Sequence, residues 1–450
     1  MDRVLVWGMA KSGVAAAGLL AKTGKHVIIN DLKTASQLGD SLAPLNGLAI
    51  EERLGEDPQG LLESVDTLVI SPGIPADHPV AVKAREMGIE VISEIELAYR
   101  FSKGLLVGVT GTNGKTTTTT LLGEIFSAWG RRTFVVGNIG EPYAAHAQET
   151  DEGSVTVCEL SSFQLETVSS LRPDISLILN LTEDHLNRHK TMENYARIKE
   201  RVFMNQTGGD VCVLNYDDPI TRGMASRANC RVLFFSRREK ISEGAYVDNG
   251  SVVFASSNGS EETVIKTEEI LLPGTHNLEN VLAAVCAAMA AGVDKQVISD
   301  TLKRFKGVEH RIEPVRELGG IRYINDSKGT NPDSTIKAVE AMTRPTVILL
   351  GGSEKNSDYS QMCGVIKNSP VKYAVLLGDT GEKIGEALKA AGFTAYEYAG
   401  HDFEAAILAA KAHASEGWNV LLSPACASFD MFRDFEHRGE EFKRIVGNLK

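Results

Sequence analysis

Short apolar runs alternate with amphipathic stretches of helical length along most of the chain. The first run, residues 4–7, is followed by helical spacing and then by a second run at residues 26–29. Continuous apolar runs of this length are typical of strands buried on both faces, as in βαβ units. The same alternation predicts further strands at residues 105–109, 155–157, 175–179, 211–214, 321–324, 346–350, 373–377 and 419–422. We therefore expect an α/β fold whose sheets are mainly parallel.

The rhythm is interrupted at residues 102–104 and again near Gly307, which predicts three domains. Before the second interruption, helices are expected from Asn277, in an alanine-rich stretch, and from Lys295. A chain of 450 residues is also too long for one ordinary core. We predict a Rossmann-like α/β domain at residues 1–103, a central α/β domain with a mainly parallel sheet at residues 104–308, and a Rossmann-like α/β domain at residues 309–450.

Composition and charge favour a globular protein and disfavour a nucleic-acid-binding or disulfide-bonded one. Hydrophobic residues make up 43% of the chain and charged residues 24%, which is typical of a packed globular protein. The formal charge of -12 disfavours nucleic acid as a partner, because a negative protein repels polyanions unless cations converge locally. The six cysteines form no Cys-x-x-Cys pair, which argues against a zinc site and a disulfide framework.

Neither a signal peptide nor a membrane span is expected. Asp2 and Arg3 lead directly into the first apolar run, without the cationic segment and long apolar stretch of a signal peptide. The most apolar helical stretch, residues 281–293, has about 13 residues, short of the roughly 20 that cross a bilayer. Together with the scattered cysteines, these features predict a cytoplasmic protein without membrane insertion.

A glycine-rich turn follows the first predicted strand. Residues 8–13 form a G-x-A-x-x-G variant of the dinucleotide-binding turn, and Asp31 ends the second strand where a ribose-binding acid would lie. The small residues could equally serve only to permit a tight turn between strand and helix. NAD is therefore not established by this motif. A second turn, residues 71–75, is expected at the carboxyl edge of the same sheet, where open α/β folds bind ligands.

Residues 110–117 have the composition and the strand-to-helix context of a phosphate-binding loop. Glycines allow backbone N–H groups to face phosphates, Lys115 can neutralise the β- and γ-phosphates, and the Thr116 hydroxyl can bind Mg²⁺. The match is imperfect, because Val109 holds the place of the first glycine. The central domain, residues 104–308, is therefore predicted to be an ATPase domain of the phosphate-loop type. The predicted ATP-binding residues of the loop are Gly111, Thr112, Asn113, Gly114, Lys115, Thr116 and Thr117.

Charged residues follow the next predicted strands of the central domain. Glu159 ends one strand, and Glu183, Asp184 and His185 follow another. Each of these residues alone is more often a helix cap or a surface charge, but the carboxyl ends of parallel strands meet at one edge, so Glu159 is a plausible metal ligand. Lys199 lies in a helical run and, from the residues alone, reads as an ordinary solvated lysine.

Several motifs in sequence order resemble those of the Mur ligase family. They are residues 110–117, 159–166, 180–186, 274–277, 309–311, 325–331 and 351–352, which span all three predicted domains. Within the family, residues 71–75, 159–166 and 422–430 resemble the D-glutamate-adding member. The Asp-Asn-Pro-Arg signature of the diaminopimelate-adding members is absent from the chain. Folylpolyglutamate synthases share the core chemistry but lack a uridine-binding first domain of this kind.

The resemblance implies an ATP- and Mg²⁺-dependent amide ligase of peptidoglycan precursor synthesis. Its small-molecule partners would be UDP-N-acetylmuramoyl-L-alanine, D-glutamate and ATP, its intermediate an acyl phosphate, and its oligomeric state a monomer. Two Mg²⁺ ions are implied. Thr116 and Glu159 would bind one, and His185 and Lys199 the other, with Lys199 matching a lysine that is carbamylated in the family.

The resemblance also assigns residues to each substrate. The residues implied in catalysis are Lys115, His185 and Lys199. Those implied for the UDP-linked substrate are Ser12, Gly13, Asp31, Ser71, Gly73, Asn138, Gln164 and His185. Beyond the phosphate loop, those implied for ATP are Asn277, Arg311, Asp326 and Lys328. Those implied for D-glutamate are Thr330, Lys355, Ser428, Phe429 and Phe435.

Alternatives of other classes stay open. A phosphate-loop NTPase that switches or transports would hydrolyse nucleotide independently of D-glutamate. An NAD-dependent dehydrogenase would bind nicotinamide at residues 8–13. Both leave residues 325–331 and 422–430 unexplained. Another Mur or folylpolyglutamate-type ligase is the third alternative, because the choice among siblings is less secure than the family.

Overall fold

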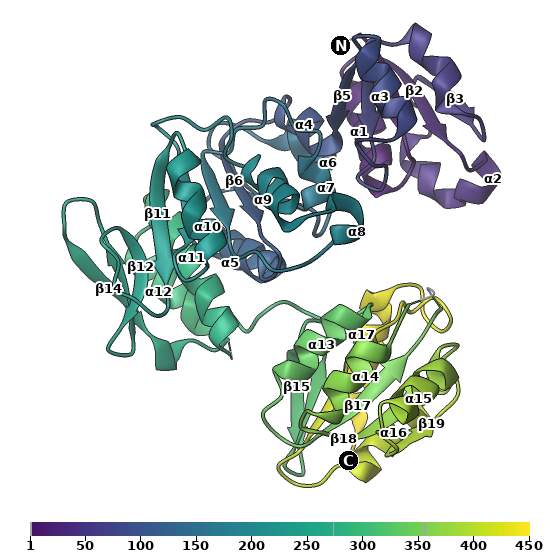
Figure 1. The fold of residues 1–450 in the computed structure, drawn as a ribbon, viewed down its shortest axis with the longest axis vertical. Helices are drawn as coiled ribbons and strands as arrows, with labels where there is room; N and C mark the ends of the chain where they lie inside the picture. The colour runs from purple at the N-terminus through teal and green to yellow at the C-terminus, as the bar shows by residue number, and fades with distance from the viewer. Residues whose placement is uncertain (1, 273, 355–356) are drawn as a thin grey trace. The chain divides into compact units, whose positions relative to one another are not determined.

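The structure is a computed structural model that describes residues 2–272, 274–354 and 357–450. The chain divides into two compact units, Met1–Phe305 and Lys306–Lys450. Three sheets organise the fold, two in the first unit and one in the second (Figure 1). Every strand that the sequence pattern predicted is present, and the expected α/β class with mainly parallel sheets is confirmed.

Five parallel strands form the first sheet. They are β1 (Arg3–Trp7), β2 (His26–Asp31), β3 (Ile50–Leu54), β4 (Thr67–Ile70) and β5 (Glu90–Ser93), in the order β3-β2-β1-β4-β5. The accompanying helices are α1 (Lys11–Lys22), α2 (Ala35–Leu38), α3 (Pro79–Glu86), α4 (Glu94–Tyr99) and the 3-10 helices η1 (Gly39–Leu45) and η2 (Pro58–Ser64). Successive strand residues face opposite sides, so Val4 joins the core that includes α1, whereas Leu5 joins the core that includes α3.

Nine strands form the central sheet. They are β6 (Leu105–Thr110), β7 (Thr133–Gly137), β8 (Val155–Glu159), β9 (Ile175–Ile178), β10 (Val211–Asn215), β11 (Arg231–Ser236), β12 (Gly244–Asp248), β13 (Ser251–Ala255) and β14 (Glu261–Lys266). Their order is β14-β13-β12-β11-β10-β9-β6-β8-β7. The pairs from β7 to β12 are parallel, and the β12–β13 and β13–β14 pairs are antiparallel. The sequence pattern did not indicate β12, β13 and β14.

Helices cover both faces of the central sheet. They are α5 (Lys115–Ala128), α6 (Tyr143–His146), α7 (Ser162–Leu165), α8 (Leu186–His189), α9 (Met192–Glu200), α10 (Pro219–Met224), α11 (Thr275–Ala290), α12 (Lys295–Arg304) and the 3-10 helices η3 (Ala147–Glu149), η4 (Ala225–Arg227) and η5 (Thr267–Glu269). Buried residues of α5, α11 and α12 share one core with Val107 and Val109 of β6. Leu106 of the same strand belongs to the other core, which continues into the first sheet.

Six strands form the sheet of the second unit. They are β15 (Glu313–Leu318), β16 (Ile321–Asn325), β17 (Thr346–Gly351), β18 (Val371–Leu377), β19 (Tyr396–Tyr398) and β20 (Asn419–Leu422), in the order β15-β16-β20-β17-β18-β19 with only the β15–β16 pair antiparallel. The helices are α13 (Pro332–Glu340), α14 (Ser360–Lys367), α15 (Gly381–Ala390), α16 (Phe403–His413) and α17 (Phe435–Asn448). Residues of α13, α14 and α15 share a core with one face, and residues of α16 and α17 share a core with the other.

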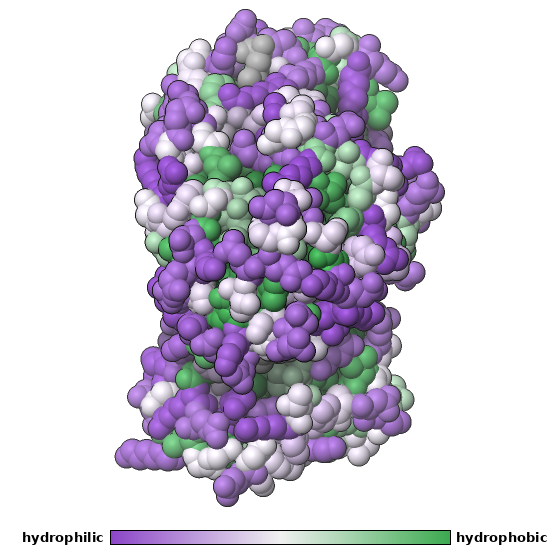
Figure 2. All heavy atoms as spheres, turned by 90° about the vertical axis from the view of Figure 1, so that its left-hand side faces the viewer, coloured by the Kyte–Doolittle hydropathy of each residue, from purple (hydrophilic) through white to green (hydrophobic). Residues whose placement is uncertain are grey.

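On the face shown in Figure 2, hydrophilic residues predominate and apolar residues lie in small groups between them. Among the residues that the structure describes, no helix is long and apolar enough to cross a membrane.

Candidate active site

The phosphate loop joins β6 to α5 in the predicted context. Gly114 caps α5 in the left-handed conformation, with a φ of 83°. A Cβ atom at this position would lie 2.1 Å from Oδ1 of Asn280, which is buried on α11. Glycine is therefore required here both by the backbone and by the neighbouring helix. Asn277 lies one turn before Asn280, and its Oδ1 accepts a hydrogen bond of 3.2 Å from the Asn280 amide.

Asn180, which follows β9, holds the loop from the side. The backbone N–H of Thr112 donates to the Asn180 carbonyl oxygen at 2.9 Å, and that of Asn113 donates to Oδ1 of Asn180 at 2.8 Å. Nζ of Lys115 donates to the carbonyl oxygens of Gly111 and Thr112 at 3.0 and 2.8 Å. The Lys115 ammonium group therefore lies over the loop, near the start of α5, where backbone N–H groups attract phosphate.

Glu159 ends β8 at the same edge of the sheet. Its side chain is almost fully buried, and Oε1 accepts a hydrogen bond from the Asn138 amide at 2.8 Å. Oε2 is also buried but has no hydrogen-bond partner among the described residues. A buried carboxylate oxygen without a partner is costly, unless a cation satisfies it. This oxygen, together with the nearly buried Thr116 hydroxyl group, fits a Mg²⁺ site, because Mg²⁺ prefers oxygen ligands.

Lys199 is buried, contrary to the solvated position that its helix pattern suggested. Only 1% of it is exposed, and its Nζ donates to Oγ1 of Thr110 at 3.2 Å. Nζ also lies 4.9 Å from the centre of the Tyr195 ring. Burial lowers the pKa of Lys199 well below its usual value, and the charge of Lys115 lowers it further, against the opposing carboxylates of Asp184 and Glu159. Lys199 therefore lies among the phosphate loop and the candidate metal ligands.

His185 has an unusual backbone for a non-glycine residue. It precedes α8 with a φ of 53°, in the left-handed region. Its ring centre is 4.8 Å from that of Phe163, and its Nε2 lies 3.4 Å from a carboxylate oxygen of Asp184. The side chain is about half exposed, with 46% of its surface accessible. His185 is thus held in place and is accessible to a substrate.

The predicted UDP residues of the first sheet gather at its carboxyl edge. Gly13 lies so close to the first strand that a Cβ atom would be 1.9 Å from the carbonyl oxygen of Gly8. Asp31 ends β2, and its Oδ2 accepts a hydrogen bond from the Met9 N–H at 2.7 Å. Ser71 lies beside Gly8, whose added Cβ would be 2.7 Å from the Ser71 Cβ. The glycines thus permit a tight turn, and Asp31 stabilises that turn. Ser12 and the exposed Gly73 lie at the same edge, in α1 and directly after Pro72.

Two other predicted substrate residues have structural partners. Gln164 is buried, and its Oε1 accepts hydrogen bonds from the backbone N–H and the hydroxyl of Ser161, which forms a capping box at α7. Asn138 donates to Glu159, so it lies beside the candidate metal ligand. The structure brings Asn138 to Glu159, whereas the side-chain oxygen Oε1 of Gln164 is engaged in capping α7.

Asp326 is a buried carboxylate of the second unit. It follows β16, and its Oδ2 accepts a hydrogen bond of 2.6 Å from the Ser423 hydroxyl, directly after the neighbouring strand β20. Its Oδ1 accepts a hydrogen bond of 3.2 Å from the Ile312 N–H. Burial raises the pKa of Asp326 to about 7, although these hydrogen bonds and the charge of Arg311 act in the opposite direction.

Other predicted residues of the second unit that the structure describes lie on the loops after β16 and β20 and at the start of α17. Nζ of Lys328 lies 5.6 Å from the centre of the Phe435 ring, and Thr330 follows on the same loop. Ser428 is buried after β20, whereas its neighbour Phe429 is 71% exposed. Lys355, predicted for D-glutamate, lies outside the described residues.

Some residues that hold these loops were not predicted from the sequence. Arg438 is fully buried on α17, and its guanidinium group donates to the Ser327 hydroxyl and to the carbonyl oxygens of Ser327, Cys426 and Ala427. It therefore ties the Asp326 loop to the loop after β20. The burial of Arg438 could not be predicted, because α17 has charged residues along much of its length. The role of Asn180 in holding the phosphate loop could have been predicted, because Asn180 follows the end of strand β9.

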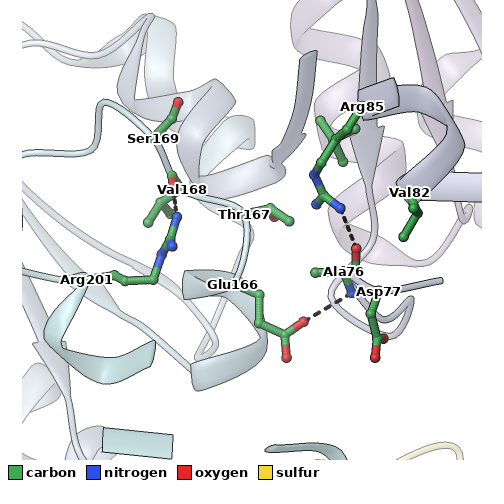
Figure 3. A pocket seen from close by; sticks show the side chains of 10 residues that line it. Ala76, Asp77, Val82, Arg85, Glu166, Thr167, Val168, Ser169 and Arg201 are labelled. Atoms are coloured by element: carbon green, nitrogen blue, oxygen red, sulfur yellow. Dashed lines mark hydrogen bonds between the residues drawn. The ribbon is translucent and has the colours of Figure 1, made fainter. Parts of the chain in front are cut away.

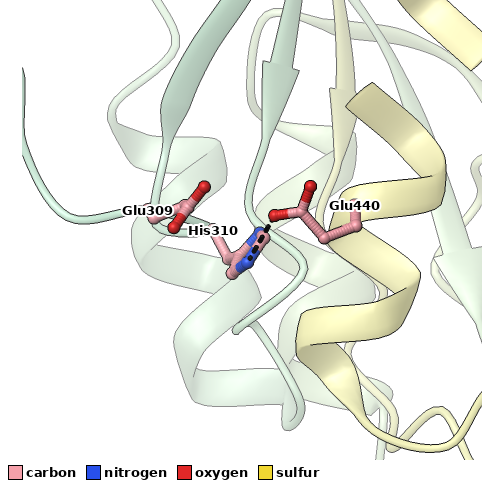
Figure 4. A group of neighbouring side chains, drawn as sticks. All are labelled: Glu309, His310 and Glu440. Atoms are coloured by element: carbon pink, nitrogen blue, oxygen red, sulfur yellow. Dashed lines mark ion pairs between the residues drawn. The ribbon is translucent and has the colours of Figure 1, made fainter. Parts of the chain in front are cut away.

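Two groups of acidic residues and histidine occur elsewhere among the described residues. Glu309, His310 and Glu440 converge in the second unit (Figure 4). Lys443 already forms ion pairs with both Glu309 and Glu440, so this group is a charge network. Asp379, His401 and Asp430 form the other group. In the first unit, a cavity of about 520 Å³ lies beside Ala76, Glu166 and Arg201 (Figure 3).

Family models match most of the chain. The Mur ligase MurD-like N-terminal domain matches residues 2–93, the Mur ligase middle domain residues 109–288, and the Mur ligase glutamate ligase domain residues 310–426. Solved structures of low sequence identity share the fold. UDP-N-acetylmuramate-alanine ligase MurC from Thermotoga maritima matches with a TM-score of 0.59 and 18% identity, covering 100% of both chains. MurF from Acinetobacter baumannii matches with a TM-score of 0.60 and 16% identity, covering 99% of this chain and 93% of the other.

Curated relatives are much closer in sequence. Two of them are named UDP-N-acetylmuramoylalanine–D-glutamate ligase. The one from Pelotomaculum thermopropionicum is 49% identical to this chain and the one from Thermoanaerobacter pseudethanolicus is 47% identical, each over 100% of this chain and 98% of the relative. The protein of the same name from Clostridioides difficile is 45% identical, over 100% of this chain and 99% of the relative. Identity at this level over whole chains, together with the three family models, means that the chain belongs to the Mur ligase family.

Proposed function

We propose that this protein is an ATP-dependent ligase that joins D-glutamate to the carboxylate of UDP-N-acetylmuramoyl-L-alanine in peptidoglycan precursor synthesis. Curated relatives of that name, 45–49% identical over the whole chain, support the choice within the family. The observation that carries the chemistry is the convergence of three features: the phosphate loop, the buried Lys199, and the buried oxygen of Glu159 that has no hydrogen-bond partner among the described residues. A nicotinamide-dependent dehydrogenase has no use for this arrangement.

The reaction has to activate a carboxylate, because a carboxylate is a poor electrophile and hydroxide a poor leaving group. A carboxylate oxygen of the substrate attacks the γ-phosphorus of ATP, the bond to the β-γ bridging oxygen breaks, and ADP leaves. The amine of D-glutamate then attacks the carbonyl carbon of the acyl phosphate. The tetrahedral intermediate expels phosphate with the electrons of the C–O bond, and the nitrogen loses a proton. Positioning and charge neutralisation are the main demands of such phosphoryl transfers.

The first unit supplies cationic and dipolar groups for this chemistry. The Lys115 ammonium and the backbone N–H groups at the start of α5 would bind the β- and γ-phosphates of ATP. Thr116 and Glu159 would hold one Mg²⁺, and His185 and Lys199 the second. Bound Mg²⁺ neutralises phosphate charge. Asn277, Arg311, Asp326 and Lys328 are proposed to contact the rest of ATP.

Lys199 is proposed to act as a carbamate. Its neutral amine would attack CO₂, a C–N bond would form, one C=O electron pair would move to oxygen, and the nitrogen would release a proton to water. An ammonium group cannot ligate Mg²⁺, whereas a carbamate offers oxygen donors. The position of Nζ beside Thr110 and its burial support this proposal, because a buried lysine is costly as a cation.

The remaining assignments are proposals of the same kind. Ser12, Gly13, Asp31, Ser71, Gly73, Asn138, Gln164 and His185 would contact the UDP-linked substrate, and Thr330, Lys355, Ser428, Phe429 and Phe435 would contact D-glutamate. We propose domains at residues 1–103, 104–308 and 309–450, a monomeric state and a cytoplasmic location.

Phosphate release from ATP tests the function. Release is measured with UDP-N-acetylmuramoyl-L-alanine present and with D-glutamate, L-glutamate, glycine or no amino acid. We expect release to depend on D-glutamate and to accompany a new amide product, detected by mass. Release that is indifferent to the amino acid would contradict the ligase and favour an NTPase. Dependence on another amino acid would favour a different member of the family.

A further inference from the structure

Arg188 lies three residues after His185, and all three nitrogens of its guanidinium group donate hydrogen bonds. Nε and one terminal nitrogen donate to Oε1 and Oε2 of Glu166, at 2.9 and 2.5 Å. The terminal nitrogens also donate to the carbonyl oxygens of Pro72 and Ile74, at 3.1 and 3.0 Å. Only 15% of the Arg188 side chain and 9% of the Glu166 side chain are exposed. The pair thus joins the segment after β9 to the turn after β4.

Glu166 reaches the same turn directly. Its Oε2 accepts a hydrogen bond of 3.3 Å from the N–H of Ala76, and Figure 3 shows the carboxylate pointing across to that backbone. The turn has its own bond, from the Ile74 N–H to the Ser71 carbonyl oxygen at 2.9 Å. The residue pair therefore contacts residues 72, 74 and 76 of one turn, which begins with a proposed substrate residue, Ser71.

The other end of the pair leads to His185. The Arg188 N–H donates to the His185 carbonyl oxygen at 3.0 Å. The ring of Phe163 contacts both side chains: its centre is 4.3 Å from the Arg188 guanidinium carbon and 4.8 Å from the His185 ring centre. Because His185 has a left-handed backbone that a non-glycine residue seldom adopts, its conformation needs such support.

We propose that the Arg188–Glu166 pair is a positioning clamp, which fixes the turn at residues 71–76 relative to His185. This inference rests on the proposed function. The clamp holds the turn that would bind the nucleotide part of the UDP-linked substrate at a set distance from the residues that would lie near the reacting carboxylate of that substrate. Neither residue contacts the reacting atoms. Arginine is required because four hydrogen bonds from one side chain need its rigid fork of donors, which the compact ammonium of lysine cannot supply.

Kinetics of Arg188→Lys test the clamp in the full-length enzyme. We expect the KM for the UDP-linked substrate to rise about tenfold or more and the KM for ATP to stay within about twofold, because the pair makes its hydrogen bonds away from the phosphate loop. The matched control is Arg197→Lys, which alters an exposed arginine paired with Glu193 at 2.7 Å in the next helix. The control should leave both KM values within about twofold. An unchanged KM for the UDP-linked substrate, or an equal rise for ATP, would overturn the proposal.

Hydrogen exchange without any ligand gives an independent measurement. Glu166→Ala removes the side-chain oxygen that accepts from the Ala76 N–H, so the Ala76 amide should exchange at least about fivefold faster than in the wild type, while amides of α5 keep their rates. Unchanged exchange at Ala76 would overturn the clamp. Because no substrate is present, this result is separate from the proposed function, which would instead fail if the wild-type enzyme formed no amide with D-glutamate.

Discussion

Gly114 and Gly130 share a backbone conformation but differ in their surroundings. Their φ angles are 83° and 84°, so any side chain is strained at both positions. At Gly114 an added Cβ would lie 2.1 Å from Oδ1 of the buried Asn280, whereas at Gly130 it would have no atom of the described residues within 4 Å, apart from those of its chain neighbours. The difference between the two substitutions therefore isolates the contact between the phosphate loop and α11.

We predict that Gly114→Ala impairs ATP binding and Gly130→Ala does not. Both substitutions should lower the free energy of unfolding by about 1 kcal/mol through backbone strain. Gly114→Ala should cost about 1–3 kcal/mol more, because Asn280 must shift, and should raise the KM for ATP about tenfold. Denaturant unfolding and steady-state kinetics measure both effects. Equal unfolding free energies for the two variants would mean that the Asn280 contact imposes no constraint.

Lys199 differs from an ordinary surface lysine in its surroundings, since it is buried beside Thr110 and Tyr195. We predict that Lys199→Ala lowers the rate of D-glutamate-dependent phosphate release about a hundredfold or more. Short carboxylic acids such as formate or acetate should restore part of it by replacing the carbamate oxygens. Arg197→Ala, two residues earlier and exposed, is the control and should keep the wild-type rate. A lack of rescue would speak against the carbamate.

At the scale of the element, α4 carries two buried carboxylates with opposite properties. Glu94 accepts a hydrogen bond of 2.6 Å from the Ala144 N–H, yet its Oε2 has no partner among the described residues, and burial raises its pKa to about 7. Burial also acts on Glu96, but hydrogen bonds from Ser170, Ser169 and Leu171 hold the pKa of Glu96 below its usual value. The helix therefore favours a neutral Glu94 and an ionised Glu96.

The raised pKa of Glu94 gives a signed dependence of stability on pH. Between its usual value of 4.5 and about 7, the folded protein keeps a proton that the unfolded chain has lost, so stability falls as pH rises through this window. Glu94→Gln removes the titration and keeps the acceptor for Ala144. We predict that the variant matches the wild type near pH 4.5 and is about 3 kcal/mol more stable at pH 8, from about 1.4 kcal/mol per pKa unit.

Denaturant unfolding across this pH range measures the difference. Glu96→Gln provides the contrast on the same helix. Because the pKa of Glu96 is lowered, its contribution is present above its usual pKa of 4.5 and is lost as pH falls through its folded value. That variant should be destabilised at neutral pH and approach the wild type in acid. A stability difference for Glu94→Gln that does not change with pH would refute the assignment.

The elements also show what the sequence could predict. Strands β6, β8 and β9 are continuous apolar runs buried on both faces, and they lead into the loop, Glu159 and Asn180, so the edge of the site followed from the pattern. Strand β14 pairs antiparallel with β13, is half exposed and has Glu261 and Lys266 at its ends. Its sequence therefore lacks the continuous apolar run by which the buried strands were predicted. The burial of Lys199 could not be predicted from the sequence either. The helical period shows which residues share a face of the helix, but it does not show which element packs against that face.

At the scale of the whole molecule, the three sheets do not each have a separate hydrophobic core. One core contains Val4 and Leu20 of the first sheet region together with Leu106 and Leu214 of the central sheet region. The two large cores that surround the third sheet contain only residues of the second unit. Among the described residues, no core includes side chains from both units. The first two sheets should therefore unfold together, because they share buried apolar contacts.

Calorimetry of the full-length protein should accordingly show two unfolding transitions. From about 0.7 kcal/mol per residue, unit Met1–Phe305 should contribute about 210 kcal/mol and unit Lys306–Lys450 about 100 kcal/mol. All proposed contacts to UDP-N-acetylmuramoyl-L-alanine lie in the first unit, so at about 100 times its Kd the substrate should stabilise only the larger transition, by about 2.7 kcal/mol. Three transitions would show that the first two sheets unfold separately. A substrate-dependent shift of the smaller transition would contradict the placement of the UDP-substrate site in the first unit.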